Sequence, residues 1–143
     1  MMKTFNKKDI PEDLRTAMNL NIQVNAKTIE LSRWREIAQK ASGAVFSHVP
    51  GHRSNKSRVE DCVIRIDTIE QAIATDMDNL MNLTKIISDT IRKISDPKYQ
   101  TLLNLRYLCG MPWEKVAEVM DYSYVHIVHR LHPKALEKFE EVV

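Results

Sequence analysis

The sequence predicts an all-α protein: a long antiparallel helical hairpin, coiled-coil-like in its packing, followed by a C-terminal helix-turn-helix module of three helices. The chain has 143 residues, 43% of them hydrophobic, but only three glycines, and each glycine falls between periodic segments. Apolar residues recur every three or four positions along two long segments. From Asp96 onward, three shorter apolar patterns are separated by residues that start or end helices.

The first long helix is expected over residues of about 11–41. Pro11 suits the first turn of a helix because proline lacks the backbone N–H that would be unsatisfied there. The predicted seam consists of Leu20, Val24, Leu31, Trp34, Ala38 and Ala41, with Lys27 as its one exception. Ile22, Ala26 and Ile29 form a second stripe beside the seam. This stripe indicates that the middle of the helix touches two neighbours.

The second long helix is expected over residues of about 59–95. Its seam is predicted to be Val59, Val63, Ile66, Glu70, Ile73, Met77, Leu80, Thr84, Ile87, Ile91 and Ile94. Such a helix is roughly 55 Å long at about 1.5 Å per residue and needs a partner along its whole length. An antiparallel hairpin supplies one, and association of several chains through the long helices supplies more. Glu70 and Thr84 set the register or oligomeric state, or lie at the wet edge of the seam.

Residues 42–58 interrupt the helical pattern with two glycines, a proline and four serines, which predicts a connecting loop. Its basic end comprises His52, Arg53, Lys56 and Arg58. Two interpretations stay open for this end: a solvated linker and an arm that contacts phosphates. The predicted domains are therefore a hairpin over residues 1–95 and a helix-turn-helix module over residues 96–143.

The module begins at Asp96-Pro97, a pair that caps and starts a helix, and this first helix is expected to end at Gly110. Its expected buried residues are Leu102, Leu103 and Leu108. Pro112 starts the second helix in the same way. The expected inner face of that helix comprises Val116, Ala117 and Met120. Ala117 allows the two helices to cross closely because its side chain is small.

The turn into the third helix is predicted from two polar residues. Asp121 lies where the chain must turn sharply, and Asp adopts left-handed backbone geometry more readily than most residues. Ser123 is a good N-cap, because its hydroxyl oxygen accepts a backbone N–H. Ile127 and Leu131, four residues apart, are expected to point inward and leave the opposite face of this helix exposed.

The exposed face of the third helix is expected to carry Val125, His129 and His132, flanked by Tyr124, His126 and Val128. Pro133 removes one helical hydrogen bond and its ring clashes with the carbonyl of His129. A kink or break is therefore predicted near His132, with a fresh turn starting at Pro133. Tyr107 and Tyr122 are expected to pack inside the module.

The module also carries a distinctive set of residues. They are Leu105-Arg106-Tyr107, Gly110, Trp113-Glu114, Val116-Ala117, Tyr122-Ser123, Ile127, Arg130-Leu131-His132 and Ala135-Leu136. This set resembles region 4 of sigma-70-type transcription factors, and most of all the corresponding tail of small phage and prophage late-gene regulators of the RinA/ArpU type. That family also has an N-terminal helical hairpin with a polar loop, so the resemblance covers most of the chain.

The resemblance implies a DNA-binding transcriptional regulator of phage or prophage type, with double-stranded DNA as its partner and RNA polymerase open as a second one. By position, it places Tyr124, Val125, Val128 and His129 in the major groove. It makes Arg106, Lys115 and Arg130 candidate phosphate contacts. Ser123, His126 and Lys134 complete the predicted DNA-binding set.

Two other functions compete with this one. Sigma factors present Arg, Glu and Gln on the reading face, whereas Val125 and Val128 donate no hydrogen bond to a base. The module could instead dock on RNA polymerase or another factor without reading bases. A DNA-packaging protein of the small-terminase kind is a third possibility, since such proteins also join a helix-turn-helix to oligomerising helices.

Composition argues against several other classes of protein. The net charge is only +2, and from Pro97 onward six basic residues balance six acidic ones, so DNA affinity should be modest and salt-sensitive. No catalytic constellation, cofactor motif or phosphate loop is found, and an enzyme is not expected. His126, His129 and His132 lack the other ligands of a metal site.

The localisation is predicted from two features. The two cysteines suit a reducing compartment, and no long apolar run or signal peptide is found. We therefore expect a cytoplasmic protein without membrane contact, in the host cell if it is phage-encoded.

Overall fold

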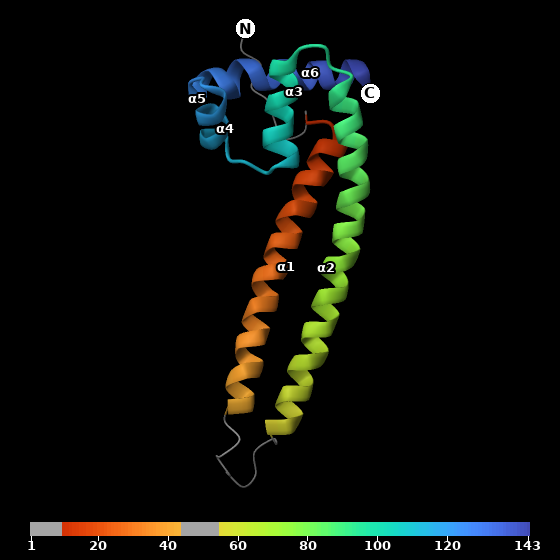
Figure 1. The fold of residues 1–143 in the computed structure, drawn as a ribbon, viewed down its shortest axis with the longest axis vertical. Coiled ribbons are helices and arrows are strands. Elements are labelled where there is room, and N and C mark those ends of the chain that lie inside the picture. Colours follow the sequence, from red (N-terminus) through yellow and green to blue (C-terminus); the bar gives the residue numbers. More distant parts are fainter. Residues whose placement is uncertain (1–9, 44–54) are drawn as a thin grey trace. The chain divides into compact units, whose positions relative to one another are not determined.

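The computed structural model describes residues 10–43 and 55–143, and within these ranges it contains helices and no strand. The elements in chain order are α1 (Glu12–Gly43), α2 (Asn55–Arg92), α3 (Pro97–Leu103), the π-helical turn η2 (Asn104–Leu108), α4 (Trp113–Met120), α5 (Tyr124–His126), the π-helical turn η3 (Ile127–Leu131) and α6 (His132–Val142) (Figure 1). The predicted all-α fold, with two long helices followed by short C-terminal ones, is confirmed.

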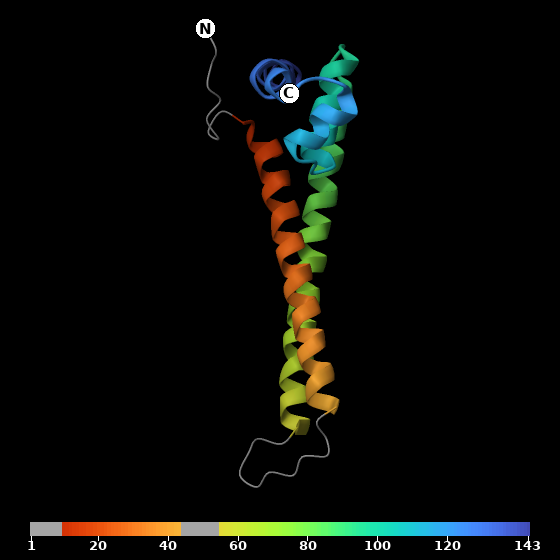
Figure 2. The same cartoon turned by 90° about the vertical axis from the view of Figure 1, so that its left-hand side faces the viewer.

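The two long helices pack against each other side by side and run in opposite directions, as both views show (Figures 1 and 2). The predicted hairpin is therefore confirmed, although its ends differ. Asn55 already begins α2, so the last residues of the predicted loop are helical, and α2 ends at Arg92. His52 and Arg53, part of the proposed phosphate-contacting arm, lie outside the described residues.

The chain packs as two compact units. One unit consists of the residues up to Asn21 together with Leu80–Val143, and the other of Ile22–Asn79. The beginning of α1 and the end of α2 thus belong to the same unit as the short C-terminal helices. The domain boundary predicted between residues 95 and 96 stays a prediction, because a compact packing unit is not necessarily a segment that folds alone.

The core of the first unit joins residues that are far apart in the sequence. Its fully buried members include Leu14 and Ala17 of α1, Ile87 of α2, and Leu136 and Phe139 of α6. The remaining buried members are Ile91, Ile94, Tyr99, Leu102, Leu103, Tyr107, Val116, Ala117, Ile127, Leu131 and Ala135. A core of this size stabilises the short helices, which are too short to persist alone in water.

In the second unit, every other position of the predicted α2 seam is wrong by one residue. Cys62 and Ile69 are buried, whereas Val63 is 55% exposed and Met77 is 48% exposed. From Val59 the predicted seam advances by four residues and then three, whereas the observed seam advances by three and then four. The two seams coincide at every seventh residue, so both contain Ile66 and Ile73. The two apolar side chains at 63 and 77 favoured the incorrect register.

A polar pair occupies the seam of the second unit. The ammonium of Lys27 donates a hydrogen bond to the carboxylate of Asp76, and both side chains are mostly buried. This pair explains why a lysine interrupts the apolar stripe of α1, and it opposes slipped registers in which either charge would lie alone. At the edge of the seam, Arg35 pairs with Glu70 at 2.8 Å, and both side chains are about half exposed. Glu70 therefore lies at the wet edge.

The second apolar stripe of α1 faces outward. Ile22 and Ile29 are 60% and 73% exposed, and Ala26 is exposed as well. The predicted contact of this stripe with a second neighbour is therefore not made within the described part of the chain.

Candidate nucleic-acid interface

The first helix of the module is held at both ends by the residues expected to do so. Asp96 is the N-cap of α3 and its carboxylate accepts the backbone N–H of Lys98 at 2.9 Å, with Pro97 in the first turn. After η2 the chain turns at Gly110, whose φ of 67° favours glycine. These features fix the position from which α4 starts.

The turn between α4 and α5 has the predicted geometry. Asp121 adopts a left-handed conformation (φ 59°, ψ 45°), and its N–H bonds back to the last turn of α4. The N–H of Tyr122 donates to the carbonyl of Ala117 at 3.0 Å. Ser123 is the N-cap of α5, and its hydroxyl oxygen accepts the backbone N–H of His126 at 3.2 Å. Capping therefore fixes the direction in which the outer helix leaves the turn.

The outer helix runs through α5, η3 and α6, and it is braced by two buried side chains. Ile127 and Leu131 lie in the core, as predicted, and Val128 is partly buried against it. The exposed residues at the start of this helix are Tyr124, Val125, His129 and Arg130. The module thus presents an exposed helical face that begins at a capped N-terminus.

Of the kink or break predicted near His132, the break does not occur, because helical structure continues from Tyr124 to Val142. The helix widens instead: the N–H of His132 bonds to the carbonyl of Ile127, five residues back, in the π-helical turn. Pro133 then lies in the first turn of α6, as the predicted fresh start requires. The widening falls where a regular α-helix would press the His129 carbonyl against the proline ring.

His132 was predicted to be exposed, and this is wrong: it is a buried residue of the module. Its Nε2 lies 2.6 Å from the hydroxyl of Tyr107, and Trp113 meets its ring edge-on at 4.4 Å between centroids. Burial raises the pKa of the Tyr107 phenol, so the hydroxyl keeps its proton and shares a hydrogen bond with the imidazole of His132. Burial, helped by the charge of Arg106, lowers the pKa of His132 to about 4, so the imidazole is neutral near pH 7.

Arg106, a predicted phosphate contact, directs its guanidinium group into the module. Its Nη1 donates to the carbonyl of Met111 at 2.9 Å, and its Cζ lies 4.5 Å from the centre of the Trp113 ring. Its Nε is buried and has no hydrogen-bond partner among the described residues. These contacts give Arg106 a structural role that the sequence resemblance did not suggest.

We expect the substitution Arg106→Ala to lower the free energy of unfolding of the module by about 1–3 kcal/mol, since it removes a hydrogen bond and a cation–π contact. Lys115→Ala is the matched control, because Lys115 pairs with Glu118 at 3.5 Å on an exposed surface. Denaturant unfolding followed by the fluorescence of Trp113, in a Trp34→Phe background that makes it the sole tryptophan, measures both. An equal, small effect of the two substitutions would show that the inward contacts of Arg106 contribute nothing.

The remaining predicted residues have surface positions. Lys115 and Lys134 are exposed, and Ser123 is exposed beside its capping bond. His126 is half-buried and stacks on Tyr122, with 5.2 Å between ring centroids. Tyr107 packs inside the module as predicted, whereas Tyr122 is exposed and that prediction is wrong.

Four large apolar residues near the turn between α4 and α5 are exposed, and we call them the apolar patch: Val119, Tyr122, Tyr124 and Val125. The sequence predicted exposure of Tyr124 and Val125 but not of Val119 and Tyr122. Its four members are between 40% and 59% exposed. The helical periodicity of α4 could have revealed Val119. When Val116 and Ala117 face the core, Val119 lies outside the buried face of the helix. Large apolar residues grouped on a surface are typical of a contact with another molecule.

Within residues 10–43 and 55–143, no group of three or more His, Cys, Asp or Glu side chains is placed to hold a metal ion. None of the helices in those same ranges combines the length and apolar character needed to cross a bilayer. Comparison of the chain with protein-family models, with curated proteins and with solved structures found no match.

Proposed function

We propose that this protein is a DNA-binding transcriptional regulator of phage or prophage type, which contacts double-stranded DNA through its C-terminal module. One observation carries the proposal: a capped helix, braced from behind by Ile127 and Leu131, presents an exposed outer face right after a tight turn from α4. This is the arrangement in which helix-turn-helix proteins insert the start of the second helix into the major groove.

Base contacts are assigned to Tyr124, Val125 and His129. The tyrosine hydroxyl and the imidazole can exchange hydrogen bonds with base edges, and the valine can meet a thymine methyl group. Val128 is partly buried and takes at most a minor share. Only two of these three side chains can form hydrogen bonds with bases. We therefore expect them to distinguish poorly between DNA sequences.

Phosphate contacts are assigned to Arg130, Lys115 and Lys134, which are all exposed. Ser123 and His126 lie at the start of the outer helix, where the capping bond between them supports the position of the helix. Arg106 is left out, because its guanidinium group is bound to Met111 and Trp113. The acidic residues of the module balance the basic ones, so binding depends on where the cations lie and weakens as salt is added.

We expect Arg130→Ala to weaken binding to a fluorescently labelled DNA duplex by about tenfold at low salt, since a charge-assisted phosphate contact is lost. The slope of log K against log salt should become shallower by about one. Fluorescence anisotropy at several salt concentrations measures both. Lys138→Ala, in α6 and paired with Glu141, is the control and should leave binding unchanged. Unaltered affinity and slope in Arg130→Ala would contradict groove docking.

The alternative is that the module docks on RNA polymerase or another factor without reading bases. The apolar patch favours it, because three of its four members, Tyr122, Tyr124 and Val125, lie at the turn or at the start of the outer helix. Two results together would favour this function over DNA binding. The protein would capture RNA polymerase without binding a DNA duplex at low salt, and Val125→Asp would abolish the capture.

The proposal includes association of several copies through the long helices, in the cytoplasm of the host cell. Ile22, Ile29, Val63 and Met77 are exposed apolar residues on α1 and α2, which supports it. The mass in solution tests it. A ring of many subunits would favour a DNA-packaging protein of the small-terminase kind over a regulator.

A further inference from the structure

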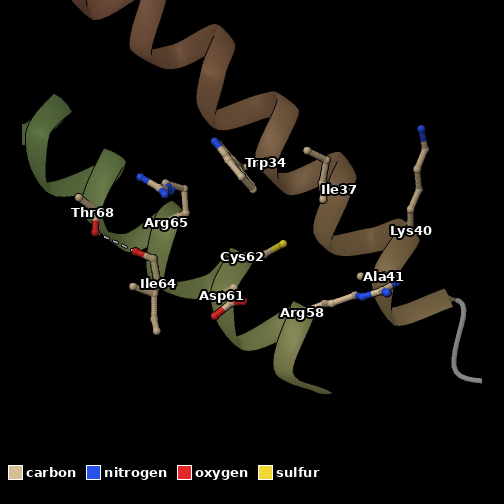
Figure 3. A pocket seen from close by; sticks show the side chains of 10 residues that line it. All are labelled: Trp34, Ile37, Lys40, Ala41, Arg58, Asp61, Cys62, Ile64, Arg65 and Thr68. Atoms are coloured by element: carbon tan, nitrogen blue, oxygen red, sulfur yellow. Dashed lines mark hydrogen bonds between the residues drawn. The ribbon is translucent and has the colours of Figure 1, made fainter. Parts of the chain in front are cut away.

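The unit formed by Ile22–Asn79 contains a cavity of about 820 Å³ between α1 and α2, open to solvent along its charged edge (Figure 3). Its lining includes Trp34, Ile37, Ala41, Arg58, Cys62 and Arg65. The volume falls in the range of roughly 300–1,000 Å³ typical of small-molecule sites. The cavity involves none of the residues assigned above to DNA.

Small side chains create this space. Ala41 and Cys62 lie on the facing sides of the two helices, where a coiled coil normally places large residues. The thiol of Cys62 points into the gap between α1 and α2 (Figure 3), and Cys62 is buried. Trp34 and Ile37 supply an apolar wall on the α1 side. The cavity therefore has a surface that favours a flat apolar group.

The edge of the cavity is positively charged. The guanidinium of Arg65 lies 5.6 Å from the centre of the Trp34 ring, and Arg58 reaches from α2 toward Ala41 of α1 (Figure 3). Lys40 is a third cation, and Asp61 is the one carboxylate among the lining residues that the structure describes. Since one carboxylate can balance only one of the three cations, the lining carries a net positive charge that favours an anion.

We propose that this cavity binds a small organic anion with a flat apolar body. The apolar body lies against Trp34 and Ile37, and the anionic group accepts hydrogen bonds from Arg58 and Arg65. An uncharged molecule of the same shape binds less well, because it offers the two guanidinium groups no charged acceptor. This inference is independent of the function proposed above.

The test compares two dyes on the full-length protein: anilinonaphthalene sulfonate, which is anionic, and phenylnaphthylamine, its uncharged analogue. We expect saturable binding of the sulfonate dye at one site per chain. The double substitution Arg58→Gln and Arg65→Gln should weaken it about tenfold or more while leaving the uncharged dye unaffected. Arg33→Gln is the matched control, because Arg33 pairs with Glu36 on the outer surface of α1 and does not line the cavity.

A second variant, Ala41→Leu, fills the cavity and should abolish binding of both dyes while thermal unfolding shows a folded protein. Unchanged dye binding in Ala41→Leu would place the dye elsewhere and overturn the proposal. Equal affinity of the two dyes for the wild type would overturn it too. If the double arginine variant loses DNA affinity and keeps the sulfonate dye, these cations serve nucleic acid and the proposed site is wrong.

Discussion

Replacing Leu14 with alanine is expected to lower the free energy of unfolding of the unit that contains the C-terminal module by about 2–5 kcal/mol. Leu14 lies near the start of α1, yet it is fully buried in the same core as Tyr107, Leu136 and Phe139. The substitution leaves a cavity that the surrounding helices fill only in part. Denaturant unfolding measures the loss, and hydrogen exchange of the α3 and α4 amides locates it in the module.

Ile29→Ala is the matched control on the same helix. Ile29 is 73% exposed, so its truncation should change the free energy of unfolding by no more than about 0.5 kcal/mol. If Leu14→Ala leaves the exchange of the α3 and α4 amides at the wild-type rate, the start of α1 does not support the module and the shared core is refuted.

Acidification is expected to destabilise the module through His132. The unfolded chain takes up a proton on this residue near pH 6.5, whereas the folded protein, in which the pKa is lowered to about 4, does so only at more acidic pH. Between these two values the unfolded state binds more protons, so stability falls as the pH falls. The full loss is about 3 kcal/mol and is complete near pH 4, whereas above about pH 6.5 His132 contributes no pH dependence.

Unfolding curves of the wild type and His132→Phe from pH 8 to about pH 4 isolate this contribution, since carboxylates affect both proteins alike. The variant keeps an aromatic ring beside Trp113 but cannot take up the proton, so its stability should depend less on pH. It should also be less stable at neutral pH by about 1–3 kcal/mol, because the buried hydroxyl of Tyr107 loses its hydrogen-bond partner. His129→Gln, at an exposed position, should follow the wild-type profile. Parallel profiles for wild type and His132→Phe would refute the role of His132.

Local signals predicted the turns and caps of the module well. Asp96, Asp121 and Ser123 act within a few residues of their own positions, so their geometry depends little on the rest of the chain. Ile127 and Leu131 are buried as their four-residue spacing indicated. The two long helices were equally clear, because apolar periodicity accumulates over many turns.

The errors arose where packing between distant segments decides. Neighbouring residues such as Cys62 and Val63 differ by about 100° around a helix, and only the partner helix determines which of them is buried. A sequence pattern that counts apolar residues could not find Asp76 in the seam, since its burial depends on Lys27 of the other helix.

His132 was misplaced for a related reason. Its expected exposure followed from the geometry of a regular α-helix. The π-helical turn Ile127–Leu131 instead contains an extra residue, which rotates the residues after it around the helix axis. That rotation carries His132 toward Tyr107 and Trp113. Arg106 points inward because its guanidinium group packs on the ring of Trp113. The sequence distance between Arg106 and Trp113 does not reveal this contact.

The interleaved core also has a consequence for biosynthesis. Leu14 and Ala17 leave the ribosome long before Leu136 and Phe139, the residues that share their core in the finished protein. A nascent chain therefore cannot complete the burial of these apolar side chains until α6 has been translated, which exposes it to aggregation and to chaperones. Contacts so distant along the chain also form slowly, so the last step of maturation should be the packing of α6 against the beginning of α1 in their common core.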